Sequence, residues 1–201
     1  DTLRRTIAII PQESVLFVGS IKSNLDPFNC STDEEIWAAL ENVNLAESIR
    51  ALPEKLDAPV AENGSNYSLG QRQLFCIARA ILSKAKILVL DEASSALDLD
   101  TDAFIQKTIR QCFKDLTVLT VAHRLNTIID SDKVLLMDGG CLLEFDEPIN
   151  LLNDTNSSFY DLVSHSGPAA TRKLIECAQE AHDDRVKLGV LPPDSEKKDV
   201  K

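Results

Sequence analysis

The sequence is poor in basic residues and in long apolar runs. Lys and Arg number 21 against 32 Asp and Glu, and the formal net charge of −11 argues against a protein that binds the phosphate backbone of nucleic acid. No apolar run approaches the ~18 residues that a bilayer-spanning helix needs, and the chain does not open with a charged and then apolar signal pattern. We therefore expect any membrane role to come through a partner or through residues outside this sequence.

The sequence also lacks paired cysteines. Its five cysteines are scattered and form no C-x-x-C pair. An odd number without regular spacing argues against a disulfide framework and is typical of reduced thiols in a cytosolic protein. The length of 201 residues suits one ordinary domain with a tail.

The stretch from Ser68 to Gln73 carries a strong helix-start signal. Ser68 and Gln71 fit an S-x-x-Q capping box, so we expect Ser68 to be the N-cap of a helix. Gly70 would lie in an exposed first turn, where backbone N–H groups stay open to an anion. The sequence therefore predicts a phosphate site at this helix end.

A buried strand that ends in two acids follows. Ile87–Leu90 is a continuous aliphatic run, typical of a strand covered on both faces of a parallel sheet. Asp91 and Glu92 come directly after it, at the carboxyl end where ligands of such sheets collect. One carboxylate could hold Mg²⁺ on a nucleotide while the other positions or deprotonates water. The pair by itself fits a solvated strand end equally well.

The remaining patterns predict an alternation of strands and helices, which describes βαβ units and a parallel sheet. The expected elements are a strand at Thr6–Pro11, a helix begun by Ser31 or Thr32 with Glu35 as capping partner, helices at Leu45–Leu52, Gln71–Leu82 and Thr101–Phe113, a strand at Thr117–Ala122, a hairpin of Lys133–Met137 with Cys141–Phe145, and short helices at Pro148–Leu152 and Phe159–Val163. A weakly amphipathic helix is expected at Ala169–Ala181, followed by a polar, disordered tail from Leu191.

Taken in order, five features resemble the nucleotide-binding domain of ATP-binding cassette (ABC) transporters. They are Gln12, the Ser68–Gln73 stretch, Asp91-Glu92, Asp98 and His123. The resemblance covers about residues 1–163 and implies an α/β P-loop NTPase fold of the ABC ATPase type, with a parallel-sheet core and a helical subdomain at about 13–67. Residues 164–201 would be a C-terminal extension, partly disordered.

The resemblance implies catalytic and metal roles for four of these residues. Gln12 would contact Mg²⁺ and couple to the transmembrane part, and Asp91 would hold the metal. Glu92 would activate water, and His123 would hydrogen-bond the γ-phosphate of ATP. The implied cofactors are ATP and Mg²⁺.

The resemblance also implies a composite site between two domains. Ser68, Leu69, Gly70 and Gln71 would bind the γ-phosphate of ATP held by the opposite nucleotide-binding domain of a head-to-tail dimer. Asp98 would lie at the same interface.

Several details narrow the resemblance. The wording from Ser20 to Phe28 looks like the C subfamily, the multidrug-resistance-associated type, and Leu69 in place of the usual glycine resembles its second nucleotide-binding domain, as does Glu92. No G-x-x-x-x-G-K-[ST] motif occurs, so the loop that cradles phosphates is missing. We therefore expect an N-terminally truncated domain whose Walker A loop would precede Gln12.

The resemblance implies an ATPase that drives export of organic anions or conjugates at the cytosolic face of a membrane. Its partners would be a second nucleotide-binding domain and transmembrane domains, not nucleic acid, and the 201 residues alone would be inactive. One alternative is a truncated, non-catalytic fragment that occupies the dimer interface. The other is a DNA-repair or chromosome-maintenance ATPase, which would need heptad coiled coils between Gln12 and Ser68, and the sequence has none there.

Overall fold

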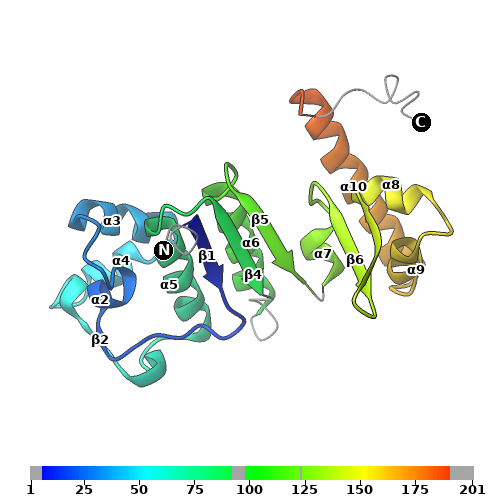
Figure 1. The fold of residues 1–201 in the computed structure, drawn as a ribbon. Helices are drawn as coiled ribbons and strands as arrows, with labels where there is room; N and C mark the ends of the chain where they lie inside the picture. The colour runs from blue at the N-terminus through cyan, green and yellow to red at the C-terminus, as the bar shows by residue number, and fades with distance from the viewer. Residues whose placement is uncertain (1–5, 92–97, 123, 191–201) are drawn as a thin grey trace. The chain divides into compact units, whose positions relative to one another are not determined.

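The computed structural model describes residues 6–91, 98–122 and 124–190, and it divides the chain into two compact units, residues 1–121 and 122–201 (Figure 1). The first unit contains β1 (Ile7–Ile10), β2 (Gly19–Ser20), α2 (Ile21–Leu25), α3 (Asp33–Asn42), α4 (Ala46–Arg50), η1 (Lys55–Asp57), β3 (Pro59–Val60), η2 (Glu62–Gly64), α5 (Leu69–Leu82), β4 (Ile87–Asp91), α6 (Leu99–Cys112) and β5 (Thr117–Val121). The second contains α7 (Leu125–Ile128), β6 (Val134–Asp138), β7 (Cys141–Asp146), α8 (Pro148–Asn153), α9 (Ser158–Ser164) and α10 (Pro168–Lys187).

The first unit is built on a three-stranded parallel sheet in the order β1-β4-β5 (Figure 1). Ile10 pairs in register with Leu90, and Asp91 pairs with Val121, so the carboxyl ends of all three strands meet at one edge. Helix α5 packs against β1 and α6. The predicted βαβ organisation is therefore confirmed.

Only one face of this sheet is buried. Leu88 and Leu90 in β4 are buried with Ile10, whereas Val89 is half-buried and its neighbour Ile9 in β1 is 65% exposed. The expectation that Ile87–Leu90 is covered on both faces is wrong for this chain. The physical reason is that the described helices of the first unit pack into one apolar cluster with the buried strand residues, and among them none covers Ile9.

Short helices fill the interval between β1 and α5. Thr32 is the N-cap of α3, as expected: its Oγ1 accepts a hydrogen bond from the Glu35 amide, and the Thr32 amide donates to Glu35 Oε2. Ser31 lies outside the helix. Ile36 and Leu40 of this helix are fully buried. Helix α2 was not predicted, because its five residues give too short a periodic pattern, although Ser20 and Ser23 form a capping box at its start.

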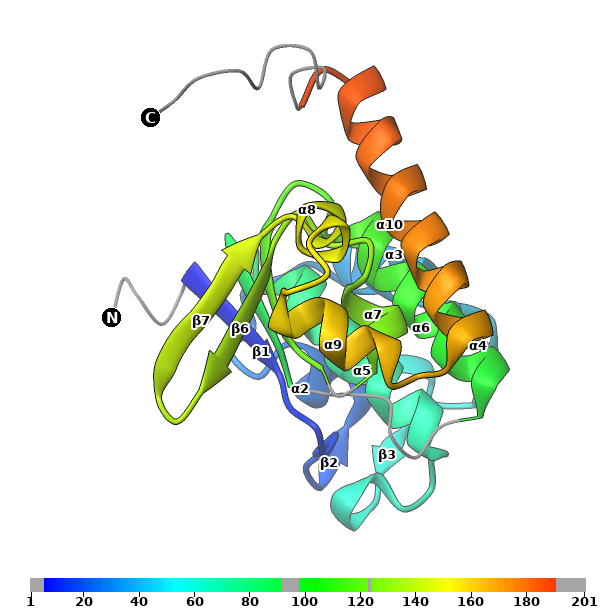
Figure 2. The ribbon, with the colours of Figure 1, turned by 90° about the vertical axis from the view of Figure 1, so that its right-hand side faces the viewer.

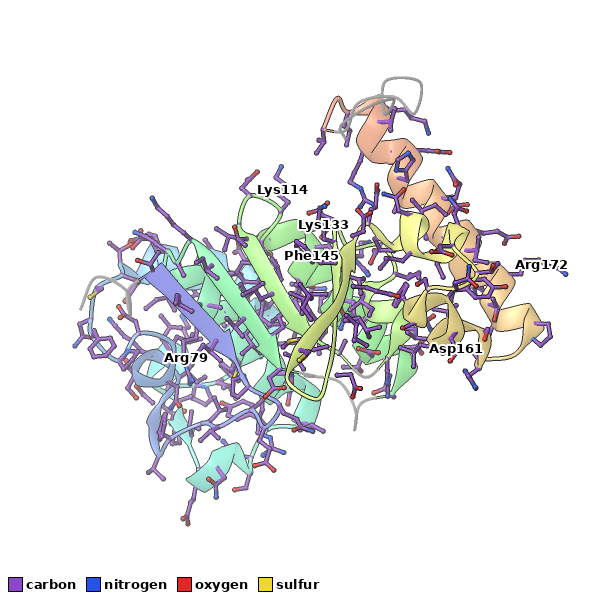
Figure 3. All side chains as sticks on the ribbon, turned by 45° about the vertical axis from the view of Figure 1, so that its right-hand side comes forward. Arg79, Lys114, Lys133, Phe145, Asp161 and Arg172 are labelled. Carbon is purple, nitrogen blue, oxygen red and sulfur yellow. The ribbon has the colours of Figure 1, made fainter. Side chains whose placement is uncertain are left out.

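The described part of the second unit contains a hairpin and four helices (Figure 2). Strands β6 and β7 turn through Gly139 and Gly140, both at positive φ, where glycine carries no steric cost. On the hairpin, the ammonium group of Lys133 lies 5.3 Å from the ring centroid of Phe145 (Figure 3). The hairpin and the helices at 148 and 159 are confirmed.

Helix α10 is longer than the hydrophobic pattern predicts. The expected helix ended at Ala181, but α10 continues to Lys187. Side-chain hydrogen bonds hold its last turns in place, because His182 and Arg185 both bond the Glu147 carboxylate. Helix α10 packs against α8 and α9 (Figure 2). The division at residue 163 stays a prediction, and the expected tail from Leu191 lies outside the described residues.

Candidate functional site

Two of the predicted site residues lie at the carboxyl edge of the sheet. Asp91 ends β4 and is exposed, and Gln12 is exposed two residues beyond the end of β1. Because β1 and β4 are parallel neighbours in register, both side chains belong to the same edge. This edge is where ligands of open parallel sheets bind.

Helix α5 begins at a complete capping box. The Gln71 amide donates to Ser68 Oγ at 3.1 Å, and the Ser68 amide donates to Gln71 Oε1 at 2.9 Å, which confirms Ser68 as the N-cap. Between described residues no hydrogen bond uses the amides of Leu69 and Gly70, the first two helical positions. Two N–H groups at the positive end of a 14-residue helix are thus left for an anion.

Gly70 is buried, not exposed as the sequence suggested. Leu74 and Ile77, four and seven residues further on, are buried as well, so Gly70 begins the apolar stripe of α5. The two amides at this helix end therefore belong to a partly buried turn rather than to an open one, and anion binding there stays a prediction. Leu69 itself is half-buried.

Asp98 caps a helix, in addition to its predicted role at the dimer interface. Its Oδ1 accepts a hydrogen bond from the Thr101 amide at 2.9 Å, which makes Asp98 the N-cap of α6. This bond lowers the pKa of the Asp98 carboxyl. The side chain is exposed, so the cap leaves it open to solvent on its other side.

Glu92 and His123 lie outside the described residues, so their predicted roles remain predictions. Within residues 6–91, 98–122 and 124–190, no three His, Cys, Asp or Glu side chains gather as a metal site. Asp91 and Gln12 nevertheless offer a carboxylate and an amide oxygen at one edge. That donor set fits Mg²⁺ held jointly with nucleotide phosphates, since Mg²⁺ binds through one or two protein oxygens and keeps its remaining positions for phosphate and water.

Sequence reasoning missed a buried polar contact beside these residues. Ser14 Oγ donates to Gln73 Oε1 at 2.8 Å, and both side chains are buried. A signal was present in the sequence, since Gln73 interrupts the apolar positions of α5 beside Leu74. Its partner could not be named without the fold, because 59 residues separate the pair.

Comparison with known proteins identifies the family of the chain. Residues 1–95 match the family described as ABC transporter. The chain is 54% identical over 180 residues to human ATP-binding cassette sub-family C member 4, and 52% identical over 182 residues to the probable multidrug resistance-associated protein lethal(2)03659 of Drosophila melanogaster. The chain belongs to the ABC transporter family. Its sequence is of the C-subfamily type.

A solved ABC transporter shares the fold. A bacterial Atm1-family ABC exporter with ATP bound superposes with a TM-score of 0.73 at 34% identity, over 83% of this chain and 29% of that chain. The fold is therefore that of the ABC ATPases, as expected. The alignments with the human and Drosophila relatives each cover 90% of this chain, and the chain spans only 14% and 13% of the lengths of these two relatives.

Among the described residues of this ABC transporter chain, none of the helices has both the length and the hydropathy to cross a bilayer. All five cysteines are free, as expected from their spacing.

Proposed function

We propose that this chain forms part of the ATP-hydrolysing engine of a C-subfamily ABC exporter. The observation that carries the proposal is the meeting of Gln12 and Asp91 at the carboxyl edge of a parallel sheet, in a chain whose α5 presents a capped, anion-ready N-terminus. The work of the engine would be hydrolysis of ATP to ADP and phosphate with Mg²⁺.

Each site residue has a proposed part in that reaction. Asp91 and Gln12 hold Mg²⁺ at the sheet edge, and Glu92 takes a proton from the attacking water. His123 donates a hydrogen bond to the γ-phosphate through one ring nitrogen, which the neutral imidazole can do. Positioning and charge stabilisation supply most of the rate in phosphoryl transfer, so the residues act by placement.

The start of α5 serves a nucleotide held by a second nucleotide-binding domain. Ser68 and Gln71 fix the first turn, and the amides of Leu69 and Gly70 face the γ-phosphate across a head-to-tail dimer. Asp98 lies at the same interface while it caps α6. The other partners are the transmembrane domains of the exporter, and the engine works at the cytosolic face of their membrane.

The cargo that we propose is the class of amphipathic organic anions and conjugates, which rests on the C-subfamily resemblance. Leu69 and Glu92 further favour the second nucleotide-binding domain of such a transporter. Against a DNA-repair ATPase, the interval between β1 and α5 holds helices of ten residues or fewer and no coiled coil.

Paired substitutions in the full-length protein test the division of labour. Glu92→Gln keeps size and hydrogen bonding but removes the base, so ATP should stay bound while turnover falls by roughly 10²–10⁴. Asp91→Asn should instead weaken Mg²⁺-ATP binding itself. Equal loss of ATP binding in both variants would show that the roles are wrongly divided. Purified residues 1–201 should show no hydrolysis above background, because they contain no G-x-x-x-x-G-K-[ST] loop.

A charge placed at the start of α5 tests the composite site. Gly70→Asp would set a carboxylate near the γ-phosphate, but Gly70 is buried, so this change would also disturb the core. Leu69→Asp puts the same charge one residue earlier, at a half-buried position. An acidic side chain in the first turn stabilises a helix, because the N-terminal end of the helix dipole is positive. Two unit charges ~4 Å apart repel by ~4 kcal/mol at an effective dielectric of about 20.

We expect Leu69→Asp to abolish hydrolysis at the site completed by the partner's phosphate loop and to spare nucleotide binding at its own domain. Leu69→Asn is the matched control, with nearly the same shape and no charge, and it should keep most of the hydrolysis. Site-resolved nucleotide trapping distinguishes the two sites. Loss of binding at its own domain alone would refute the composite site.

A further inference from the structure

A buried hydrogen bond joins the segment after β1 to helix α5. Ser14 is 6% exposed and Gln73 is 1% exposed, and Ser14 Oγ donates to Gln73 Oε1 at 2.8 Å. Ser14 stands two residues beyond Gln12, and Gln73 stands two residues beyond Gln71. The bond therefore links the two segments that carry the proposed nucleotide contacts.

The surroundings of this bond are apolar. Leu16, two residues after Ser14, and Leu74, next to Gln73, belong to the core cluster of the first unit. The Ser14 hydroxyl also reaches the buried Cys76 thiol, whose pKa is raised by burial. In such surroundings a polar bond is shielded from competing water, so its geometry is enforced.

Stability alone does not explain a glutamine at this position. Burying an amide costs free energy that only its hydrogen bonds offset, and the Gln73 Nε2 atom is buried without a hydrogen-bond partner among the described residues. An unbranched apolar side chain of similar length would avoid that cost. What glutamine provides instead is a directional bond to one specific partner.

The helix can carry a displacement of Gln73 to its own N-terminus. Gln73 lies five residues after the N-cap Ser68, a rise of roughly 7.5 Å along a hydrogen-bonded helix. Because a helix moves as a rigid element, a shift of the segment from Gln12 to Ser14 would displace the amides of Leu69 and Gly70 by a similar amount.

We propose that Ser14 and Gln73 are positioning residues that make the start of α5 follow the Gln12 segment when nucleotide binds. The inference rests on the proposed function, because it takes Gln12 and the start of α5 as nucleotide contacts. The Ser14–Gln73 bond, called the tie below, acts on the nucleotide only through Gln12 and the start of α5. Neither Ser14 nor Gln73 touches the nucleotide.

The test uses the full-length protein and removes the bond from either side. Gln73→Met fills the same space without polar atoms, and Ser14→Ala removes the donor. Each change should lower kcat for ATP hydrolysis by about 5- to 100-fold, the size of a typical coupling between sites, with KM for ATP changed less than about twofold. The double variant should be no worse than the more severe single variant, since both remove one bond.

Thr108→Val is the matched control. Thr108 is 3% exposed in α6, and its Oγ1 donates to the Phe104 carbonyl of the same helix at 2.9 Å. The substitution removes a buried side-chain bond that ties no second segment, so kcat should stay unchanged. A kcat within twofold of the unaltered protein in Gln73→Met, or losses that multiply in the double variant, would overturn the proposal.

Hydrogen exchange gives a readout that a purely structural role would not move. In the unaltered protein, ATP should slow exchange at the amides of 12–14 and of 68–73 together. In Ser14→Ala it should slow exchange only at 12–14. Unchanged coupling in Ser14→Ala would refute the tie even if Gln73→Met does not fold. Absence of ATP hydrolysis in the unaltered protein would instead contradict the proposed function itself.

Discussion

Helix α5 in the first unit and helix α10 in the second are held by different kinds of contact. In α5, 8 of 14 residues are buried, and all but Gln73 are apolar or glycine. In α10, only Leu174, Ala178 and His182 of 20 residues are buried. Apolar packing along one stripe thus fixes α5, whereas α10 depends on a small apolar contact and on charged groups near its end.

The carboxylate of Glu147 bonds two side chains of α10, those of His182 and Arg185. Glu147 is 4% exposed; its carboxylate oxygens lie 3.0 Å from His182 Nδ1, and Arg185 Nη2 lies 2.7 Å from Oε1. An ionised carboxylate only accepts hydrogen bonds, so Nδ1 of His182 carries a proton. The Arg185 guanidinium also donates to the Asp130 carbonyl. The comparison teaches that a helix with little apolar surface can be fixed by a few directional bonds, and that these are lost together.

The largest effect is expected from Glu147→Gln. It removes the charge from the buried side of the pair and leaves the half-buried Arg185 only its 3.5 Å ion pair with the exposed Asp132. Breaking a buried pair from one side costs about 3–5 kcal/mol, and the remaining pair places the expected loss at the lower end of that range. Hydrogen exchange of the α10 amides should accelerate accordingly. Asp161→Asn is the control, because Asp161 is exposed (Figure 3) and the exchange of α10 should not change. Unaltered exchange in Glu147→Gln would mean that apolar contacts alone hold α10.

The corresponding change in α5 is Ile77→Ala. Ile77 is fully buried, and truncating a buried isoleucine to alanine costs about 2–5 kcal/mol. Urea unfolding followed by fluorescence of Trp37, the only tryptophan, reports on the first unit. Phe28→Ala should leave the midpoint unchanged, since Phe28 is 84% exposed. If Ile77→Ala also speeds exchange in α10, the two units are not independent.

Lowering the pH should destabilise α10 before it destabilises the first unit. Burial alone would raise the pKa of the Glu147 carboxyl, but hydrogen bonds from Arg185 and His182 outweigh it and lower the pKa. The stabilisation is therefore complete above the ordinary carboxyl pKa of about 4.3 and is lost as the pH falls through the lower folded-state value. Exchange of α10, corrected for its intrinsic pH dependence, should accelerate over that range before Trp37 fluorescence changes. Simultaneous changes would contradict the comparison.

The smallest effect is expected from Ser68→Ala, which removes the N-cap of α5. Loss of a serine cap costs about 0.5–2 kcal/mol. The urea midpoint of Trp37 fluorescence should fall slightly, and the first-turn amides of α5 should exchange faster. Ser68→Asp keeps an N-cap acceptor and should restore the midpoint. A loss as large as that of Ile77→Ala would mean that the cap does more than end the helix.

Much of the local structure in both units was predictable because its signals come from residues close together in the sequence. The capping boxes of Ser68 and Thr32, the aliphatic run of β4 and the glycine turn of the hairpin each depend on residues a few positions apart. The order of five features, which are Gln12, the Ser68–Gln73 stretch, Asp91-Glu92, Asp98 and His123, also predicted the family. What failed was exposure: Gly70 is buried and Val89 is only half-buried, because burial depends on which elements pack against a face.

The sequence by itself determined the approximate bounds of the longer strands and of most helices, and that strands β1, β4 and β5 alternate with helices, because hydrophobic period and caps act within one or two turns. It did not predict the two-residue strands β2 and β3. Only the tertiary structure decided that Gln12 and Asp91 share one sheet edge, that Ser14 bonds Gln73, and that α10 extends to Lys187 on the carboxylate of Glu147. Those features join residues 35 to 79 positions apart, and no local pattern encodes such a pairing.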